Sequence, residues 1–238
     1  MNSDSGGIAA LLLLADGRFP AGGHVHSGGA EAALVDGRLD GPRALAAYAV
    51  GRLHTTGLVD AALTAAAVLR LAVDCDPRGC GPGRTLRLLD AEADARLTMA
   101  PLRESSRRLG RQLIRAATGC WPGPAVEAAA AVHPAGPHQM VALGAVAHAA
   151  GIGALDAARL SLHHTLTTPL QAALRLGGLD PYAVAGLAAS LAPVVDQVAT
   201  EAALAGEGPV DELPCLVGPL TEIAAVEHVA RRDRLFAT

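Results

Sequence analysis

The chain of 238 residues contains no lysine, so all 19 of its basic side chains are arginines. This excludes a Schiff-base lysine, a lysine general base and a phosphate-binding loop of the usual lysine type. Aromatic residues make up only 2% of the chain, whereas β-sheets favour aromatic and β-branched side chains. The chain is instead rich in Ala and Leu, which have high helix propensity. The composition therefore predicts an all-α fold whose helices pack closely.

An excess of positive charge is also missing. The formal net charge of −4 gives none of the basic surface that binding to nucleic acid requires. The longest stretch without a charged residue, 128–155, is interrupted by three His and two Pro, so we expect no membrane span there. The N-terminus lacks the positive region of a signal peptide, which favours a cytoplasmic protein. The few cysteines are scattered without a zinc-binding spacing and are expected to be free thiols: Cys75, Cys80, Cys120 and Cys215.

The spacing of apolar residues and helix breakers predicts a single domain, 1–238, built as a bundle of eight to ten helices. Clusters of Pro and Gly predict flexible loops near 74–84 and 121–137. Pro193 is expected to kink the helix that contains it. Helices are expected over 8–15, from the Ser27–Gly29 turn to about 35, and over 42–73, 84–99, 101–118, 137–150, 155–177, 181–204 and 219–232.

A glycine-rich loop at 21–29 carries His24 and His26, whose imidazoles could bind a metal ion. Two ligands do not make a metal site, so surface or core histidines are the favoured interpretation. A small helical metal- or ligand-binding enzyme that uses this loop remains the alternative. The loop has the spacing of a phosphate-binding loop as far as Gly28, but Gly29 and Ala30 replace the Lys and the Ser/Thr, so no nucleotide cofactor is expected. Common catalytic motifs are absent from the sequence, which favours a protein without enzymatic activity.

The expected helix 101–118 carries five arginines against one carboxylate, Glu104. This side is either a solvated surface or a docking surface for an acidic partner, and the sequence leaves both open. The arginines are Arg103, Arg107, Arg108, Arg111 and Arg115.

Leu235 and Phe236 place apolar bulk beside the C-terminus. Because a frayed tail would leave this bulk in water, the pattern favours an anchor that docks on the chain's own body or on a partner. We interpret it as a mobile apolar tip, whose deletion with residues 234–238 should impair partner binding more than folding.

Four stretches, in this order, resemble the UreF family of urease accessory proteins. The first runs from Leu11 through Pro20 to a Ser-x-Gly-x-Glu helix start. The second is a Glu-Ser…Gly helix at 104–110, the third an Ala-x-Arg-Leu helix at 173–176, and the fourth a His…Arg-Leu-Phe ending at 228–236. The family usually has aromatic residues where this chain has His24 and His26, and it closes differently from Ala237 and Thr238. The chain therefore resembles a divergent branch of the family.

The resemblance implies an all-helical homodimer that binds the accessory protein UreD (also called UreH) and the GTPase UreG. The assembly would sit on apo-urease and couple GTP hydrolysis to nickel delivery, with no catalytic residues in this chain. Residues expected to contact partners are those of the matching stretches and of the adjoining loop and tail: His24, His26, Ser27, Gly29, Glu31, Glu104, Ser105, Gly110, Arg175, His228, Arg231, Arg234, Leu235 and Phe236.

Overall fold

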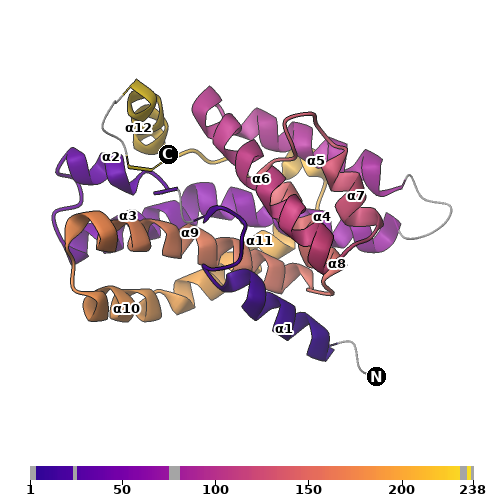
Figure 1. Cartoon of the computed structure of the whole chain (residues 1–238), viewed down its shortest axis with the longest axis horizontal. Helices are drawn as coiled ribbons and strands as arrows, with labels where there is room; N and C mark the ends of the chain where they lie inside the picture. Colours follow the sequence, from indigo (N-terminus) through magenta and orange to yellow (C-terminus); the bar gives the residue numbers. More distant parts are fainter. Residues whose placement is uncertain (1–3, 24–25, 75–80, 231–234, 237–238) are drawn as a thin grey trace.

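A computed structural model describes residues 4–23, 26–74, 81–230 and 235–236 of the chain. Within these ranges the chain forms helices and no β-strand, which confirms the all-α prediction. Figure 1 shows the arrangement. The elements are α1 (Asp4–Ala15), α2 (Ala30–Val35), α3 (Pro42–Arg52), the π-helical turn η2 (Leu53–Gly57), α4 (Leu58–Asp74), α5 (Pro82–Arg96), α6 (Ala100–Cys120), α7 (Pro124–Ala130), α8 (Gln139–Ala149), α9 (Ala154–Gly177), α10 (Pro181–Ser190), α11 (Ala192–Glu207), the 3-10 turn η3 (Val210–Glu212) and α12 (Pro219–Ala230).

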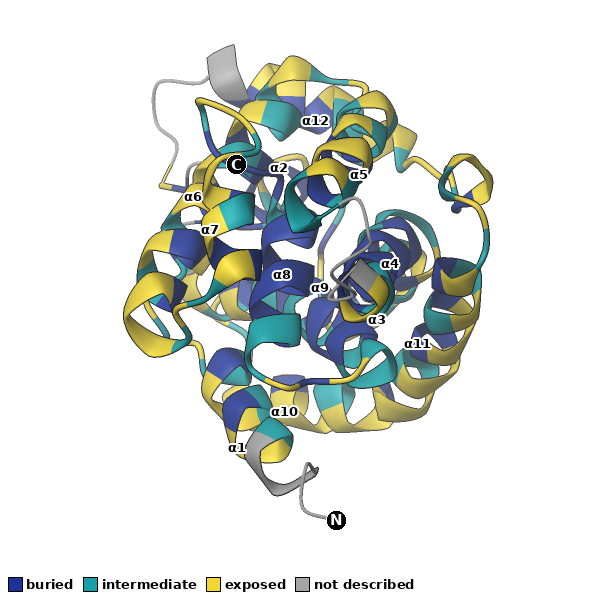
Figure 2. Ribbon diagram, turned by 90° about the vertical axis from the view of Figure 1, so that its right-hand side faces the viewer, coloured by how far each residue is buried: buried dark blue, intermediate teal, exposed yellow. Residues whose placement is uncertain are grey.

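The core is organised around α4, which packs against α8, α9 and α11. Figure 2 shows α4 and α8 as largely buried helices inside the bundle. Small residues let these helices approach closely. A Cβ added to Gly144 of α8 would lie 2.5 Å from the Ala67 Cβ, and one added to Gly206 of α11 would lie 3.0 Å from the Ala66 amide nitrogen. The Ala-rich composition therefore serves close helix packing, as the sequence predicted.

The continuous helix Pro42–Val73, made of α3, η2 and α4, is long and apolar enough to cross a membrane by length and composition alone. However, 67% of its most apolar window is buried inside the protein. That burial is the property of a core helix, since a membrane-spanning helix needs apolar surface for lipid.

Two expected segments differ from the structure. The connection 121–137 contains the helix α7, and Pro124 stands in its first turn, where a missing amide hydrogen removes no helical hydrogen bond. The expected helix 181–204 is two helices, α10 and α11, which meet at Leu191 with a bend of 43°. Pro193 lies in the first turn of α11, next to this bend, which agrees with the kink predicted at this proline. Of the loop expected at 74–84, residues 75–80 lie outside the described residues.

The arginines of α6 are used largely inside the molecule. Arg107 pairs with Asp90 at 2.9 Å and with Asp94 at 2.8 Å. Arg103 donates to the carbonyl oxygen of Leu97 at 2.6 Å, and Arg111 donates to that of Ala135. Arg107 thus ties α5 to α6, and Arg103 and Arg111 tie the neighbouring connections to α6, so the five do not form one free docking surface. Arg108 and Arg115 remain exposed.

Candidate functional site

Seven of the residues predicted to contact partners gather where the loop before α2, α6, α12 and the C-terminal tail converge. Six of them are buried polar or apolar residues, and the seventh is a glycine at a helix start. They are His26, Ser27, Gly29, Glu31, Ser105, His228 and Phe236. Three of the four matching stretches, which are far apart in the sequence, therefore meet in one region of the fold.

Glu31 fixes the tail segment 235–236. Its carboxylate accepts hydrogen bonds from the amides of Leu235 at 2.6 Å and Phe236 at 3.0 Å. His228 of α12 donates through Nε2 to the Phe236 carbonyl oxygen at 3.1 Å, and the same nitrogen lies 3.7 Å from Glu31 Oε2. The side chain of Phe236 is buried, whereas Leu235 is 76% exposed. The tail therefore docks on the chain's own body, and the prediction of a mobile apolar tip is wrong for Phe236.

Gly29 stands where α2, α3 and α12 come together. It is the N-terminal cap of α2 with φ +83°, a backbone conformation that favours glycine. A Cβ here would lie 2.7 Å from the Tyr48 hydroxyl oxygen and 3.2 Å from Thr221 Cγ2. Tyr48 in turn donates a hydrogen bond to the Gly28 carbonyl oxygen at 2.7 Å. The glycine of the Ser-x-Gly-x-Glu pattern is thus explained by close packing around a turn.

His26 points into the protein. Its Nδ1 lies 3.0 Å from the Ser105 hydroxyl, and both residues are buried. His24 lies outside the described residues. Among the residues that are described, no group of three or more His, Cys, Asp or Glu side chains could hold a metal ion. His26 is therefore a core histidine that joins the glycine-rich loop to α6.

The remaining predicted residues are dispersed. Gly110 is buried, and a Cβ there would lie 2.1 Å from the Pro137 carbonyl oxygen, so its glycine serves helix packing. Glu104 and Arg175 are exposed, and Arg175 borders a second pocket of about 570 Å³, which His26 and Phe236 also line. Arg231 and Arg234 lie outside the described residues.

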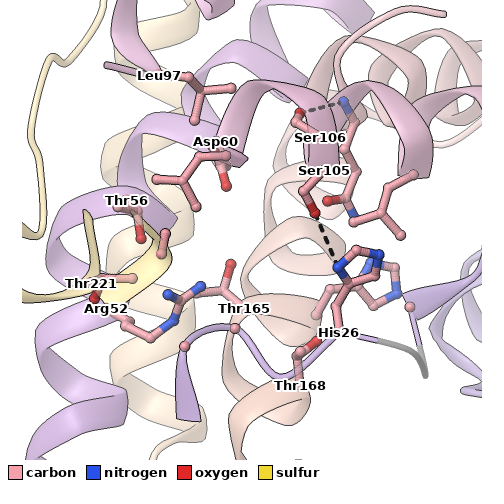
Figure 3. Close-up of a pocket in the computed structure, with 18 of the residues that line it drawn as sticks. His26, Arg52, Thr56, Asp60, Leu97, Ser105, Ser106, Thr165, Thr168 and Thr221 are labelled. Carbon is pink, nitrogen blue, oxygen red and sulfur yellow. Dashed lines mark hydrogen bonds between the residues drawn. The ribbon is translucent and has the colours of Figure 1, made fainter. Parts of the chain in front are cut away.

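A pocket of about 180 Å³ lies directly beside this region. Figure 3 shows Arg52, Thr56 and Asp60 lining it, opposite Ser105 and His26. Arg52, Thr56 and Asp60 follow one another at intervals of four residues along the helix that contains η2. Such π-helical turns are often found at functional sites. The sequence alone did not predict them, because other polar side chains, among them His54 and Thr55, stand on the same helix.

Burial controls the ionisation of two groups in this pocket. Burial raises the pKa of Asp60 to about 7, and the positive charge of Arg52 offsets only part of this effect. Asp60 is half-buried and lines the pocket. Burial also lowers the pKa of His164 to about 4, and its Nε2 donates to the Leu14 carbonyl oxygen at 3.0 Å. His164 is therefore a neutral imidazole at physiological pH.

Comparison with known proteins identifies the family of this chain. The UreF family model matches residues 39–192. The urease accessory protein UreF of Mycolicibacterium vanbaalenii is 37% identical over 231 residues, which cover 97% of this chain and 99% of the relative. The UreF proteins of Mycobacterium sp. (strain JLS) and Mycobacterium tuberculosis (strain H37Rv) are 39% and 37% identical, with the same coverage. The chain belongs to the UreF family of urease accessory proteins.

Proposed function

We propose that this protein is a non-catalytic scaffold for urease maturation in the cytoplasm. In this role it binds UreD/UreH and the GTPase UreG, self-associates as a homodimer, and regulates GTP-dependent delivery of nickel to apo-urease. The relatives are named urease accessory proteins, which supports a role in maturation. The finer proposal, binding to partner proteins, is carried by one observation on α12.

The outer side of α12 and the segment before it expose large apolar side chains. Leu220 is 65% exposed and Ile223 is 54% exposed. We define the α12 surface as Leu216, Val217, Leu220, Ile223 and Val226, all of which are exposed. Large apolar side chains gathered on one helix are typical of a protein–protein contact.

The opposite side of α12 is held firmly by the body. Ala224 and Ala225 are buried, and His228 is bonded to the tail segment that Glu31 fixes. A helix positioned before it meets its partner loses less conformational entropy on binding. The signature residues would therefore act by presenting the α12 surface, and we propose that UreD/UreH is the protein that covers it.

We expect Leu220→Gln to weaken binding to UreD/UreH by about tenfold, because an apolar side chain is lost from the contact. The melting temperature should hardly change, since Leu220 is exposed. Leu204→Gln is the matched control, because Leu204 is 63% exposed on α11, away from α12 (Figure 1). Surface plasmon resonance with immobilised UreD/UreH measures both variants. Equal affinities for Leu220→Gln and the natural protein would show that α12 is not the contact.

A further inference from the structure

The pocket beside the signature residues holds buried polar groups that the protein itself leaves unsatisfied. Arg52 Nε and Thr56 Oγ1 are buried and have no hydrogen-bond partner. Asp60, whose carboxyl interacts electrostatically with Arg52, lines the same pocket. Buried polar atoms without partners are costly, because they have lost water and gained nothing in return. Such a set indicates a site for a ligand that satisfies them.

The walls of the pocket favour a polar ligand of small size. Residues that carry hydroxyl groups line it from several elements, among them Thr56, Ser105, Thr165 and Thr221 (Figure 3). Its volume of about 180 Å³ leaves room for a few non-hydrogen atoms with accompanying water. Gly57 lets α9 close one side, since a Cβ there would lie 3.0 Å from Thr165 Cγ2.

The charges in the pocket favour an anion over a metal cation. Arg52 is the permanent cation among the lining residues, and its guanidinium lies near Gly28, with Nη2 3.5 Å from where a Cβ on that glycine would be. The histidines that line the pocket are His26 in the loop, neutral His164 on α9 and His228 on α12, whereas α6 and α8 contribute no charged group. The described residues offer no set of three metal ligands here.

We propose that this pocket binds a small planar oxyanion of single charge between Arg52 and the protonated carboxyl of Asp60, with Thr56 as a further donor. The planar guanidinium fits the oxygen atoms of such an anion. The Asp60 carboxyl can donate a hydrogen bond to the anion only when it carries a proton, and it repels the anion when it is ionised. Binding is therefore coupled to the uptake of one proton. This site is independent of the binding to maturation partners proposed above.

The pH dependence follows from the raised pKa of Asp60, which is about 7. Below pH 6 the carboxyl is protonated and anion affinity is constant. As the pH rises above 7, a growing fraction of the protein must first take up a proton, so the apparent affinity falls. Since one proton is involved, affinity at pH 8 should be about tenfold lower than at pH 6.

Isothermal titration calorimetry with sodium nitrate tests the proposal, because nitrate is planar and does not titrate in this range. The natural protein should bind one nitrate, about tenfold more tightly at pH 6 than at pH 8 at constant ionic strength. Asp60→Asn resembles the protonated carboxyl in shape and should bind equally at both pH values. Arg52→Gln should lose at least tenfold in affinity at both.

The variants also separate this site from unspecific effects. Asp60→Asn replaces a buried carboxyl by a neutral group of the same shape, so it should fold, and a thermal melt verifies this. Absence of nitrate binding at pH 6, unchanged affinity in Arg52→Gln, or a pH dependence that persists in Asp60→Asn would each overturn the proposal. Binding of Ni²⁺ or Mg²⁺ in place of nitrate, abolished by Asp60→Asn, would identify a cation site and overturn it as well.

Discussion

Gly110→Ala should lower the free energy of unfolding by about 3 kcal/mol, near the upper end of the usual cost of overpacking a core. The added Cβ would lie 2.1 Å from the Pro137 carbonyl oxygen and 3.1 Å from the carbonyl carbon of His138. Both atoms belong to the backbone, which cannot rotate away as a side chain can. Either α6 or the start of α8 must shift. Urea denaturation followed by circular dichroism measures the change.

Gly119→Ala is the matched control for this variant. Gly119 lies on the same helix α6, and a Cβ there would meet nothing within 4 Å. Because alanine favours helix more than glycine does, we expect a change between zero and a gain of about 1 kcal/mol. If Gly110→Ala were as stable as Gly119→Ala, this would show that α6 does not lie in close contact with Pro137.

Phe236→Ala should destabilise the protein by about 3 kcal/mol, the cost of removing a buried phenylalanine ring. The ring is buried and its backbone is held by Glu31 and His228, although it stands close to the C-terminus. Leu235→Ala is the adjacent control and should change stability by less than about 0.5 kcal/mol, because Leu235 is 76% exposed. Thermal and urea denaturation of both variants measure the difference.

This expectation revises the one drawn from the sequence for deletion of residues 234–238. Since Phe236 is part of the core, the deletion should cost folding stability in addition to any loss of partner binding. Equal stability of Phe236→Ala and the natural protein would restore the earlier interpretation of a mobile tip.

The amino-acid composition and the positions of Pro and Gly residues were sufficient to predict the all-α fold class. Close contacts between helices, such as Ala67 against Gly144, require residues with small side chains. The high Ala content makes this requirement visible in the sequence. Pro124 was misread, because a proline that ends one helix and a proline that begins another look alike without knowledge of the fold. Pro193 stands where one helix ends and the next begins, and the kink there was correctly predicted.

The candidate site was predicted in part. Motif resemblance selected Glu31, His228 and Phe236, but it could not say that they bind one another. The Glu31 side chain reaches an amide 204 positions later in the chain, and such a pairing depends on the whole fold. Arg52, Thr56 and Asp60 escaped notice because their polarity on a core helix has meaning only when a pocket faces them.

The central claim is that this chain enables the maturation of urease. The most direct measurement is urease activity in a host that expresses apo-urease, UreD/UreH and UreG with nickel, with and without this protein, after removal of the host's own UreF. The account predicts that activity rises at least tenfold when the natural protein is present and that Leu220→Gln restores less of it than Leu204→Gln. Equal urease activity with and without the chain, when immunoblots show it to be expressed and soluble, would contradict the account.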